Sequence, residues 1–165
     1  MLKLRPAVSE DVPVILQMIR ELAEYERLTA AMMVTAEDLL RDGWGSAPKF
    51  RCVLAEWSGI AAGYALFFHN YSTFRGRPGL YLEDVFVRPE FRHRGIGKGL
   101  LTHVAAIAVR EQCARFEWQV LDWNTPAIDF YKSLGARELS DWRTMRVEGG
   151  ALNALAEAAP GSPGT

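Results

Sequence analysis

The stretch EDVFVRPEFRHRGIGKGLL, from Glu83 to Leu101, constrains the fold of this chain more than any other segment. A strand-like run, VFV, is followed closely by a proline, and glycines then stand at every second position, Gly95, Gly97 and Gly99. After them the apolar residues take helical spacing. Glycines let the backbone approach a ligand, and a helix N-terminus presents unpartnered N–H groups at the positive end of its dipole. The pattern predicts a strand, an anion-binding turn and a helix.

The turn does not match two familiar phosphate-binding motifs. The dinucleotide motif G-x-G-x-x-G needs a longer interval before its third glycine, and the P-loop needs Ser or Thr after its lysine, whereas Lys98 precedes Gly99. Arg88, Arg92 and Arg94 add positive charge beside Lys98. A flexible turn with an incidental cluster of charge is the alternative at this point. Our interpretation is a cradle for a pyrophosphate group.

Composition restricts the functional classes. A chain of 165 residues that is 49% hydrophobic has room for one domain with a proper core. The net charge of -1 argues against general binding of nucleic acids. Cys52 and Cys113 are too few for a disulfide framework, which fits reduced thiols and a cytoplasmic location. The N-terminus lacks a signal-peptide pattern, and no apolar run approaches the ~20 residues that span a bilayer.

The apolar pattern and the turn signals predict the element order β-α-α-β-β-β-α-β-α-β. The expected strands are residues 2–7, 50–57, 59–71, 79–87, 115–123 and 142–149, and the expected helices are residues 9–28, 35–45, 95–113 and 124–136. This order indicates an α+β, or mixed α/β, fold. We expect a single domain over residues 1–150 and a flexible tail over residues 151–165 that starts as a helical turn.

The segment RHRGIG, Arg92 to Gly97, resembles the R/Q-x-x-G-x-G/A acetyl-CoA motif of the GNAT N-acetyltransferase superfamily. The segments YLEDVFVRPEFRHRGIG, VLDWNTPAIDFYKSLGA and RELAEYERL resemble the spermidine/spermine (diamine) and thialysine N-acetyltransferases more closely. The resemblance extends from the first helix to about Trp142. It implies the GNAT fold, a central mixed sheet flanked by helices, and transfer of an acetyl group from acetyl-CoA to a primary amine.

The resemblance implies acetyl-CoA contacts in three parts of the chain. The backbone of Val85, Phe86 and Val87 would bond the pantetheine arm, while the same side chains could equally pack as a core strand. Asn124 would contact CoA or serve only as a helix N-cap, and Tyr131 would lie at the thioester. The pyrophosphate would rest on a loop made of Arg92, His93, Arg94, Gly95, Ile96, Gly97 and Lys98.

Two residues match catalytic positions of the family. Tyr131 matches a tyrosine that protonates the departing CoA thiolate, and a phenol with a reference pKa of ~10 can supply that proton. Glu83 matches a glutamate that helps to deprotonate the amine through water. Strand alternation would place Asp84 on the opposite face, and we rank it lower, as a structural hydrogen-bonding residue. No nucleophile–histidine pair is evident, so we expect direct transfer in a ternary complex.

The resemblance also implies substrate contacts. Tyr25 and Glu26 match such positions, and a carboxylate there could pair with the distal ammonium of a diamine. Ser72 stands where polyamine-specific members carry aspartate, and Phe74 where they carry tryptophan. Glu117 replaces a histidine of the polyamine enzymes. The full predicted substrate set is Tyr25, Glu26, Glu83, Glu117, Trp118 and Asp141. The acceptor therefore stays open among diamines or polyamines, thialysine and lysine-like amino acids.

Two other functions stay open: an acetyltransferase for protein lysines or N-termini, and a CoA-binding module without catalysis. His69, His93 and His103 share no metal-like spacing with cysteines or carboxylates, so we expect no metal. We expect no nucleic acid and no membrane as partners. The resemblance implies a homodimer to which the C-terminal strand contributes contacts.

Overall fold

The computed structural model describes residues 1–160 of the 165-residue chain. The chain forms two compact units, Met1–Asp122 and Trp123–Thr165. The expectation of a single domain over residues 1–150 stays a prediction. The end of the expected tail, residues 161–165, lies outside the described residues.

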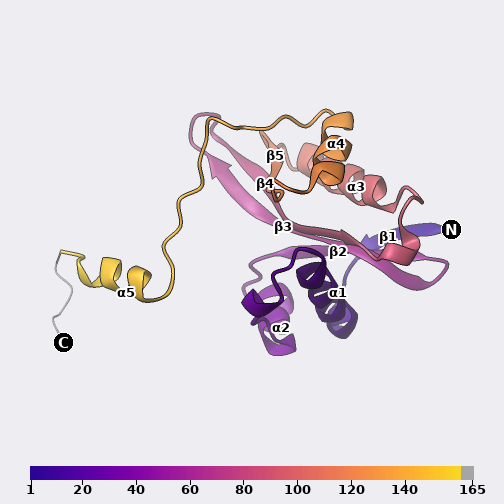
Figure 1. The fold of residues 1–165 in the computed structure, drawn as a ribbon, viewed down its shortest axis with the longest axis horizontal. Helices are drawn as coiled ribbons and strands as arrows, with labels where there is room; N and C mark the ends of the chain where they lie inside the picture. Colours follow the sequence, from indigo (N-terminus) through magenta and orange to yellow (C-terminus); the bar gives the residue numbers. More distant parts are fainter. Residues whose placement is uncertain (161–165) are drawn as a thin grey trace. The chain divides into compact units, whose positions relative to one another are not determined.

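The first unit is built around a five-stranded sheet with the strand order β1-β2-β3-β4-β5. The strands are β1 (Leu2–Pro6), β2 (Arg51–Trp57), β3 (Ile60–Ser72), β4 (Arg77–Val87) and β5 (Phe116–Trp118). The first three pairings are antiparallel, and β4 and β5 are parallel. A parallel pair needs a long crossover, which α3 (Ile96–Arg110) supplies (Figure 1). The mixed α/β fold is therefore confirmed.

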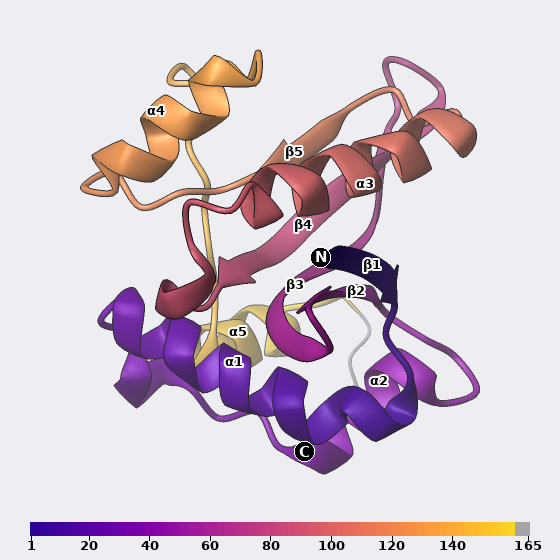
Figure 2. The ribbon, with the colours of Figure 1, turned by 90° about the vertical axis from the view of Figure 1, so that its right-hand side faces the viewer.

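Helices cover both faces of this sheet. α1 (Val12–Tyr25) and α2 (Ala36–Trp44) lie against one face, and α3 lies against the other (Figure 2). α1 buries the stripe that its helical spacing predicts, since Ile15 and Met18 are only 1% and 0% exposed. α2 begins at Thr35, whose hydroxyl oxygen accepts a hydrogen bond from the Asp38 amide at 3.2 Å.

The core under α1 and α2 reaches the C-terminal end of β4 at Phe86. Its buried members are Ala7, Val12, Ile15, Leu16, Met18, Leu39, Cys52, Leu54, Tyr64, Leu66 and Phe86. Tyr64 and Phe86 lie opposite each other on β3 and β4. This packing fixes the half of β4 that follows its pairing with β5.

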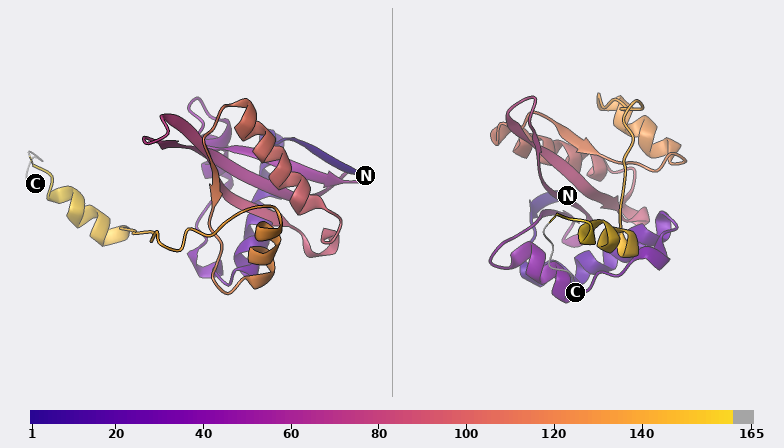
Figure 3. Two further views of the ribbon diagram at one scale, coloured as in Figure 1. Left: turned by 90° about the horizontal axis from the view of Figure 1, so that it is seen from above. Right: turned by 90° about the vertical axis from the view of Figure 1, so that its left-hand side faces the viewer.

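On the other face, α3 lies over β3 and β4 (Figure 3). Leu100 and Val104 of α3 are fully buried there. A Cβ atom on Gly99 would stand 3.1 Å from the Leu2 Cδ2 atom, closer than an ordinary contact. Gly99, the third glycine of the predicted turn, thus lets α3 pack closely against β1.

Two expected strands differ from the observed ones. β5 covers only Phe116–Trp118 of the expected residues 115–123, because its ladder with β4 stops there. Residues 142–149 form no strand, since the described sheet gives them no partner. The second unit instead carries α4 (Thr125–Ser133) and α5 (Gly149–Glu157), the latter extending the expected helical turn. Among residues 1–160, no helix combines the length and apolar character that a bilayer crossing requires.

Candidate active site

β4 and β5, the last two strands of the sheet, separate about halfway along β4. Their ladder ends at the pair Leu82–Trp118, whereas β4 runs on to Val87 and stays paired with β3 on its other side. From Glu83 onward, the edge of β4 that faced β5 can therefore offer backbone N–H and C=O groups to a ligand. The predicted residues Val85, Phe86 and Val87 lie in this segment, which we call the open edge (Glu83–Val87).

The side chains of the open edge are largely used for packing. Phe86 is 4% exposed and belongs to the core under α1, while Val85 and Val87 are half-buried. Contact between these three residues and a ligand would therefore run through the backbone. The two interpretations made from the sequence, core strand and ligand strand, are compatible.

A β-bulge lies at the start of the open edge. Leu82 is opposite Phe67 and Asp84 is opposite Leu66, so Glu83 has no direct partner on β3. A bulge interrupts the alternation of side chains between the two faces. The prediction that Glu83 and Asp84 face opposite sides assumed an uninterrupted strand, so at this bulge it stays a prediction.

Asp84 has an unusual environment. The Tyr64 hydroxyl, on a fully buried side chain, donates a hydrogen bond to Asp84 Oδ2 at 3.1 Å. Burial raises the pKa of Asp84 to about 6, and the negative charges of Glu83 and Glu26 contribute to the rise. The hydrogen bond from Tyr64 acts in the opposite direction and lowers this pKa. Asp84 thus changes ionisation close to neutral pH, which sequence reasoning missed by ranking it as a structural residue.

Glu26 joins these two carboxylates from another element. It is the C-cap of α1, and burial raises the pKa of Glu26. Its charge adds to the raised pKa of Asp84, so the two carboxyl groups interact electrostatically. We call Glu26, Glu83 and Asp84 the acidic cluster. Three carboxyl groups at one place attract a cation such as an ammonium group.

A pocket of about 360 Å³ lies between α1 and the turn that follows β4. Its lining residues are Glu21, Glu24, Tyr25, Phe86, Pro89, Glu90 and Arg92. The Arg92 guanidinium stands over the Tyr25 ring at 4.9 Å, and Arg92 Nε donates to the Val87 carbonyl at 3.1 Å. The fold thereby brings together a predicted substrate residue, Tyr25, and two predicted cofactor residues, Phe86 and Arg92.

The turn before α3 has the geometry of an anion site. His93 and Gly95 adopt left-handed backbone angles, φ 60° and 76°, and α3 begins at Ile96. Only Gly95 does so without strain, which explains a glycine there. Such a turn aims successive N–H groups at one point, and those of Ile96, Gly97 and Lys98 have no partner within the helix.

The arginines near this turn are held mainly by protein groups. Arg88 pairs with Glu21 at 2.9 Å and also donates to the Ala61 carbonyl. Arg94 stands 5.3 Å from the Trp57 ring and donates to the Glu90 carbonyl. The positive character of the turn therefore rests on its N–H groups, the helix dipole and Lys98 more than on Arg88 or Arg94.

Glu117 and Trp118 lie on β5, beside the point where the sheet opens. Glu117 pairs with Arg115 at 2.7 Å, and the Trp118 ring packs on Phe116 at 5.0 Å. Burial raises the pKa of Tyr81, and Glu83 and Glu117 add to this effect. Glu83 and Glu117 therefore both lie near Tyr81, a residue that sequence reasoning did not select.

Two positions that depart from the polyamine enzymes occupy the β3–β4 hairpin. Ser72 is 6% exposed, and its hydroxyl oxygen accepts a hydrogen bond from the Arg75 amide at 3.3 Å. Phe74 is 98% exposed. The Ser72 hydroxyl thus has a local role in the hairpin.

The second unit carries the remaining predicted residues. Asn124 precedes α4, and its carbonyl accepts from the Ile128 amide at 3.0 Å. Tyr131 lies on α4, with its ring 5.6 Å from that of Phe130. Asp141 is exposed in an irregular segment. The roles of these three residues stay predictions.

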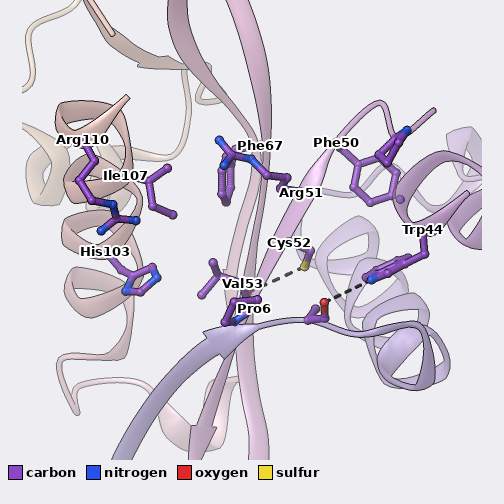
Figure 4. A pocket seen from close by; sticks show the side chains of 13 residues that line it. Pro6, Trp44, Phe50, Arg51, Cys52, Val53, Phe67, His103, Ile107 and Arg110 are labelled. Atoms are coloured by element: carbon purple, nitrogen blue, oxygen red, sulfur yellow. Dashed lines mark hydrogen bonds between the residues drawn. The ribbon is translucent and has the colours of Figure 1, made fainter. Parts of the chain in front are cut away.

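A different pocket, of about 340 Å³, lies where β1 ends beside β2. Figure 4 shows His103, Ile107 and Arg110 of α3 on one side of it, and Trp44 and Phe50 on the other. Cys52 lines it, and burial raises the pKa of this thiol to about 12, so the sulfur is unreactive. None of the predicted site residues lines this pocket.

A model of the acetyltransferase (GNAT) family matches residues 15–136 of the chain. The chain belongs to this family. Among the relatives of this acetyltransferase, thialysine N-epsilon-acetyltransferase of Sus scrofa is 43% identical over 164 residues, covering 93% of this chain and 96% of that protein. L-ornithine N5-acetyltransferase NATA1 of Arabidopsis thaliana is 33% identical, covering 93% of this chain and 87% of that protein.

Solved structures agree on the fold of the acetyltransferase. An integron cassette protein from the mobile metagenome of V. cholerae has a TM-score of 0.80 at 24% identity, covering 95% of this chain and 98% of that one. The predicted resemblance to the GNAT superfamily and its thialysine branch is confirmed. The enzyme class is likewise confirmed, which sets aside the non-catalytic module.

Proposed function

We propose that this N-acetyltransferase transfers the acetyl group of acetyl-CoA to a primary amine of a small molecule, by direct attack in a ternary complex. The proposed acceptors are thialysine, lysine-like amino acids and diamines or polyamines. The observation that carries the proposal is the acidic cluster at the open edge of β4, followed along the chain by the anion-binding turn of α3.

The open edge and the turn fit the two parts of CoA. Those backbone groups of Val85–Val87 that face away from β3, apart from the Val87 carbonyl that Arg92 already binds, would bond the amide-containing arm like an added strand. The N–H groups from His93 to Lys98 would hold the pyrophosphate, where the left-handed Gly95 and the helix dipole favour negative charge. Acetyl-CoA, when bound, supplies the thioester whose acetyl group is transferred.

The acidic cluster would bind and activate the amine. An ammonium group with a reference pKa of ~10.4 is not nucleophilic until it loses a proton. Glu83 is exposed beside the open edge and would accept that proton through water. Glu26 and Asp84 would hold positive charge nearby, so the ammonium would reach Glu83 already oriented.

Tyr131 would supply the second proton, to the CoA thiolate, and Asn124 would contact CoA. Both assignments rest on the family resemblance of the segment around α4. Tyr131→Phe is expected to lower kcat about 100-fold. A rate equal to wild type at every pH would remove the acid role of Tyr131.

The names of the relatives favour an amino acid with a side-chain amine. The Sus scrofa relative is named for thialysine and the Arabidopsis thaliana relative for L-ornithine. A diamine or polyamine acceptor has less support, because Glu117 is neutralised by Arg115 and Ser72 is used inside its hairpin. Trp118 and Asp141 would complete the acceptor site.

The test is thiol release from acetyl-CoA over a panel of thialysine, lysine, ornithine, spermidine and a lysine-containing peptide. We expect kcat/KM to be highest for thialysine or another amino acid with a side-chain amine, and mass spectrometry to find one added acetyl group on that amine. Preference for the peptide would favour the protein acetyltransferase. A protein that binds acetyl-CoA yet acetylates nothing would contradict the proposal.

We also propose a homodimer in the cytoplasm. The second unit exposes large apolar side chains that a second copy could cover, including Trp142 at 74% and Met145 at 89% exposure. Sedimentation that gives only the 18.5 kDa monomer would refute the dimer. The free thiols Cys52 and Cys113 support a reducing compartment.

A further inference from the structure

Three potential metal ligands gather at the C-terminal end of α3, although their sequence spacing gave no sign of it. One ligand atom each from His69, Glu111 and Cys113 lies within 4.8 Å of the other two. His69 Nε2 is 2.8 Å from Glu111 Oε2. His69 comes from β3, Glu111 is the C-cap of α3, and Cys113 lies in the connection to β5. The group therefore forms only in the folded protein.

The end of α3 holds two of these residues on a rigid backbone. Gln112, between Glu111 and Cys113, has a left-handed φ of 56°. The Cys113 amide donates to the Ala108 carbonyl at 2.9 Å, and the Gln112 amide donates to the Val109 carbonyl at 3.1 Å. These two bonds form a Schellman motif. In a continuing helix, residues two apart diverge, so the left-handed turn brings both side chains to one place.

The donor set suits a cation of intermediate softness. Imidazole nitrogen, carboxylate oxygen and thiolate sulfur are the ligand types that Zn²⁺ binds, at distances of about 2.0–2.3 Å. Tetrahedral bonds of these lengths set the ligand atoms about 3.3–3.6 Å apart. Atoms that already lie within 4.8 Å of one another reach this spacing by small side-chain rotations. A sulfur ligand disfavours the hard cations Mg²⁺ and Ca²⁺.

Arg51 already binds the carboxylate of this group. Its Nη1 and Nη2 atoms donate to Glu111 Oε1 at 2.7 Å and Oε2 at 2.9 Å. A carboxylate offers about four lone-pair sites, so Oε2 can bind a metal ion in place of its contact with His69 while Arg51 keeps its bonds. Arg51 then fixes the orientation of the carboxylate, as hydrogen-bond partners of metal ligands do.

The sulfur has to lose its proton on binding. Burial raises the pKa of the Cys113 thiol, the charge of Glu111 adds to this effect, and the charge of Arg51 opposes it. Metal binding breaks the S–H bond, forms a metal–sulfur bond and releases the proton to solvent. The thiolate and the Glu111 carboxylate then supply two negative charges against the divalent cation, with Arg51 opposing them.

We propose that His69, Glu111 and Cys113 bind one Zn²⁺-like divalent cation, with water in the remaining position. The site is structural, because it joins the end of α3 to β3. The 15 residues of α3 place it about 22 Å from the turn at Gly95. The proposal is therefore independent of the proposed function.

The test is metal titration of the full chain after treatment with a chelator. Wild type is expected to take up one Zn²⁺ per chain in competition with a chromophoric chelator. The Co²⁺-loaded protein is expected to show a thiolate-to-cobalt charge-transfer band. Cys113→Ser and His69→Gln should each weaken Zn²⁺ binding by at least ~100-fold. Loss of a residue that only hydrogen-bonds to a metal ligand would cost less. Zn²⁺ should raise the melting temperature of wild type and of neither variant.

Cys52→Ala and His103→Gln are the matched controls, since each removes a thiol or an imidazole outside the group and should leave Zn²⁺ binding unchanged. Circular dichroism establishes that each variant is folded, and His69→Gln, at an exposed side chain, carries the test if Cys113→Ser does not fold. A wild type that takes up no Zn²⁺ overturns the proposal. Uptake that survives both ligand variants overturns it as well.

Discussion

The two ends of α3 are built in opposite ways. The first turn contains no acidic residue but carries Lys98, and the left-handed Gly95 precedes it. The last turn carries Arg110, and a Schellman motif bonds the final carbonyl groups. Because a helix dipole favours negative charge at its N-terminus and positive charge at its C-terminus, only the C-terminal end is balanced by its own residues.

This difference indicates where a ligand binds. A helix N-terminus without a nearby negative charge lacks about 0.3–1 kcal/mol of stabilisation, which an anionic ligand can supply. The sheet shows the same contrast, since β4 is paired on both sides from Leu80 to Leu82 and opens afterwards beside the acidic cluster. The N-terminal side of α3 is thus arranged for binding and the C-terminal side for stability. Four substitutions test this difference.

Glu83→Gln should have the largest effect. It removes the proposed proton acceptor while keeping an exposed side chain of the same size at the bulge. We expect kcat to fall about 100-fold, as for loss of a general base, with an unchanged melting temperature. Steady-state kinetics on the best amine of the panel measure this. Glu37→Gln, at an exposed position of α2, is the control, and equal activity of the two variants would remove the role of Glu83.

Asp84→Asn should stabilise the protein at neutral pH. The folded-state pKa of about 6 lies above the unfolded value, so the stability contributed by Asp84 is present below pH ~4 and is lost as pH rises through 6. Between pH 4 and pH 7.5, the free energy of unfolding of the variant should rise by about 2–3 kcal/mol relative to that of wild type. Urea unfolding at several pH values checks this. Asp129→Asn, at an exposed position, should show no such gain. If the free energy of unfolding of Asp84→Asn ran parallel to that of wild type across this pH range, the prediction would be wrong.

Lys98→Glu should separate binding from stability. A carboxylate in the first turn of α3 complements the dipole and should stabilise the fold by about 0.5 kcal/mol. The same charge repels the pyrophosphate and should raise the KM for acetyl-CoA about tenfold. Arg110→Glu is the control at the C-terminal end of α3. It should lower the stability of the fold by a similar amount and leave the KM for acetyl-CoA unchanged. If both variants changed the KM alike, the two ends would not differ in function.

Gly95→Ala should have the smallest effect. It forces a side chain into a left-handed conformation at a cost of about 1 kcal/mol. Gly76→Ala imposes the same strain in the β3–β4 turn, where φ is 61° and an added Cβ also meets no atom within 4 Å. Both variants should therefore lose similar stability in urea unfolding. Only Gly95→Ala should raise the KM for acetyl-CoA, and an equal KM for both would contradict the role of the turn.

Local patterns predict much of this fold and part of the site. The helical spacing around Ile15 and Met18, and the glycines before Ile96, specify α1 and the anion-binding turn because neighbouring residues determine both. The family motif then selects Glu83, Glu26 and Tyr25, which the structure gathers near the open edge or in the pocket beside α1.

Features that depend on pairing between distant segments could not be predicted. The bulge at Glu83 follows from the register of β3 against β4, and the raised pKa of Asp84 follows from its burial in the folded protein. β5 was predicted too long because its end depends on where β4 stops being its partner. The meeting of His69 with Glu111 across 42 residues has the same origin.

Hydrogen–deuterium exchange with and without CoA is the most direct test of ligand binding at the open edge and at the turn before α3. We expect slower exchange on CoA binding for the amides of Val85–Val87 and Ile96–Lys98. We expect no change for those of Glu111–Cys113 at the other end of α3. Protection confined to the C-terminal end of α3, or no protection at the open edge and the turn when CoA is bound, would contradict this expectation.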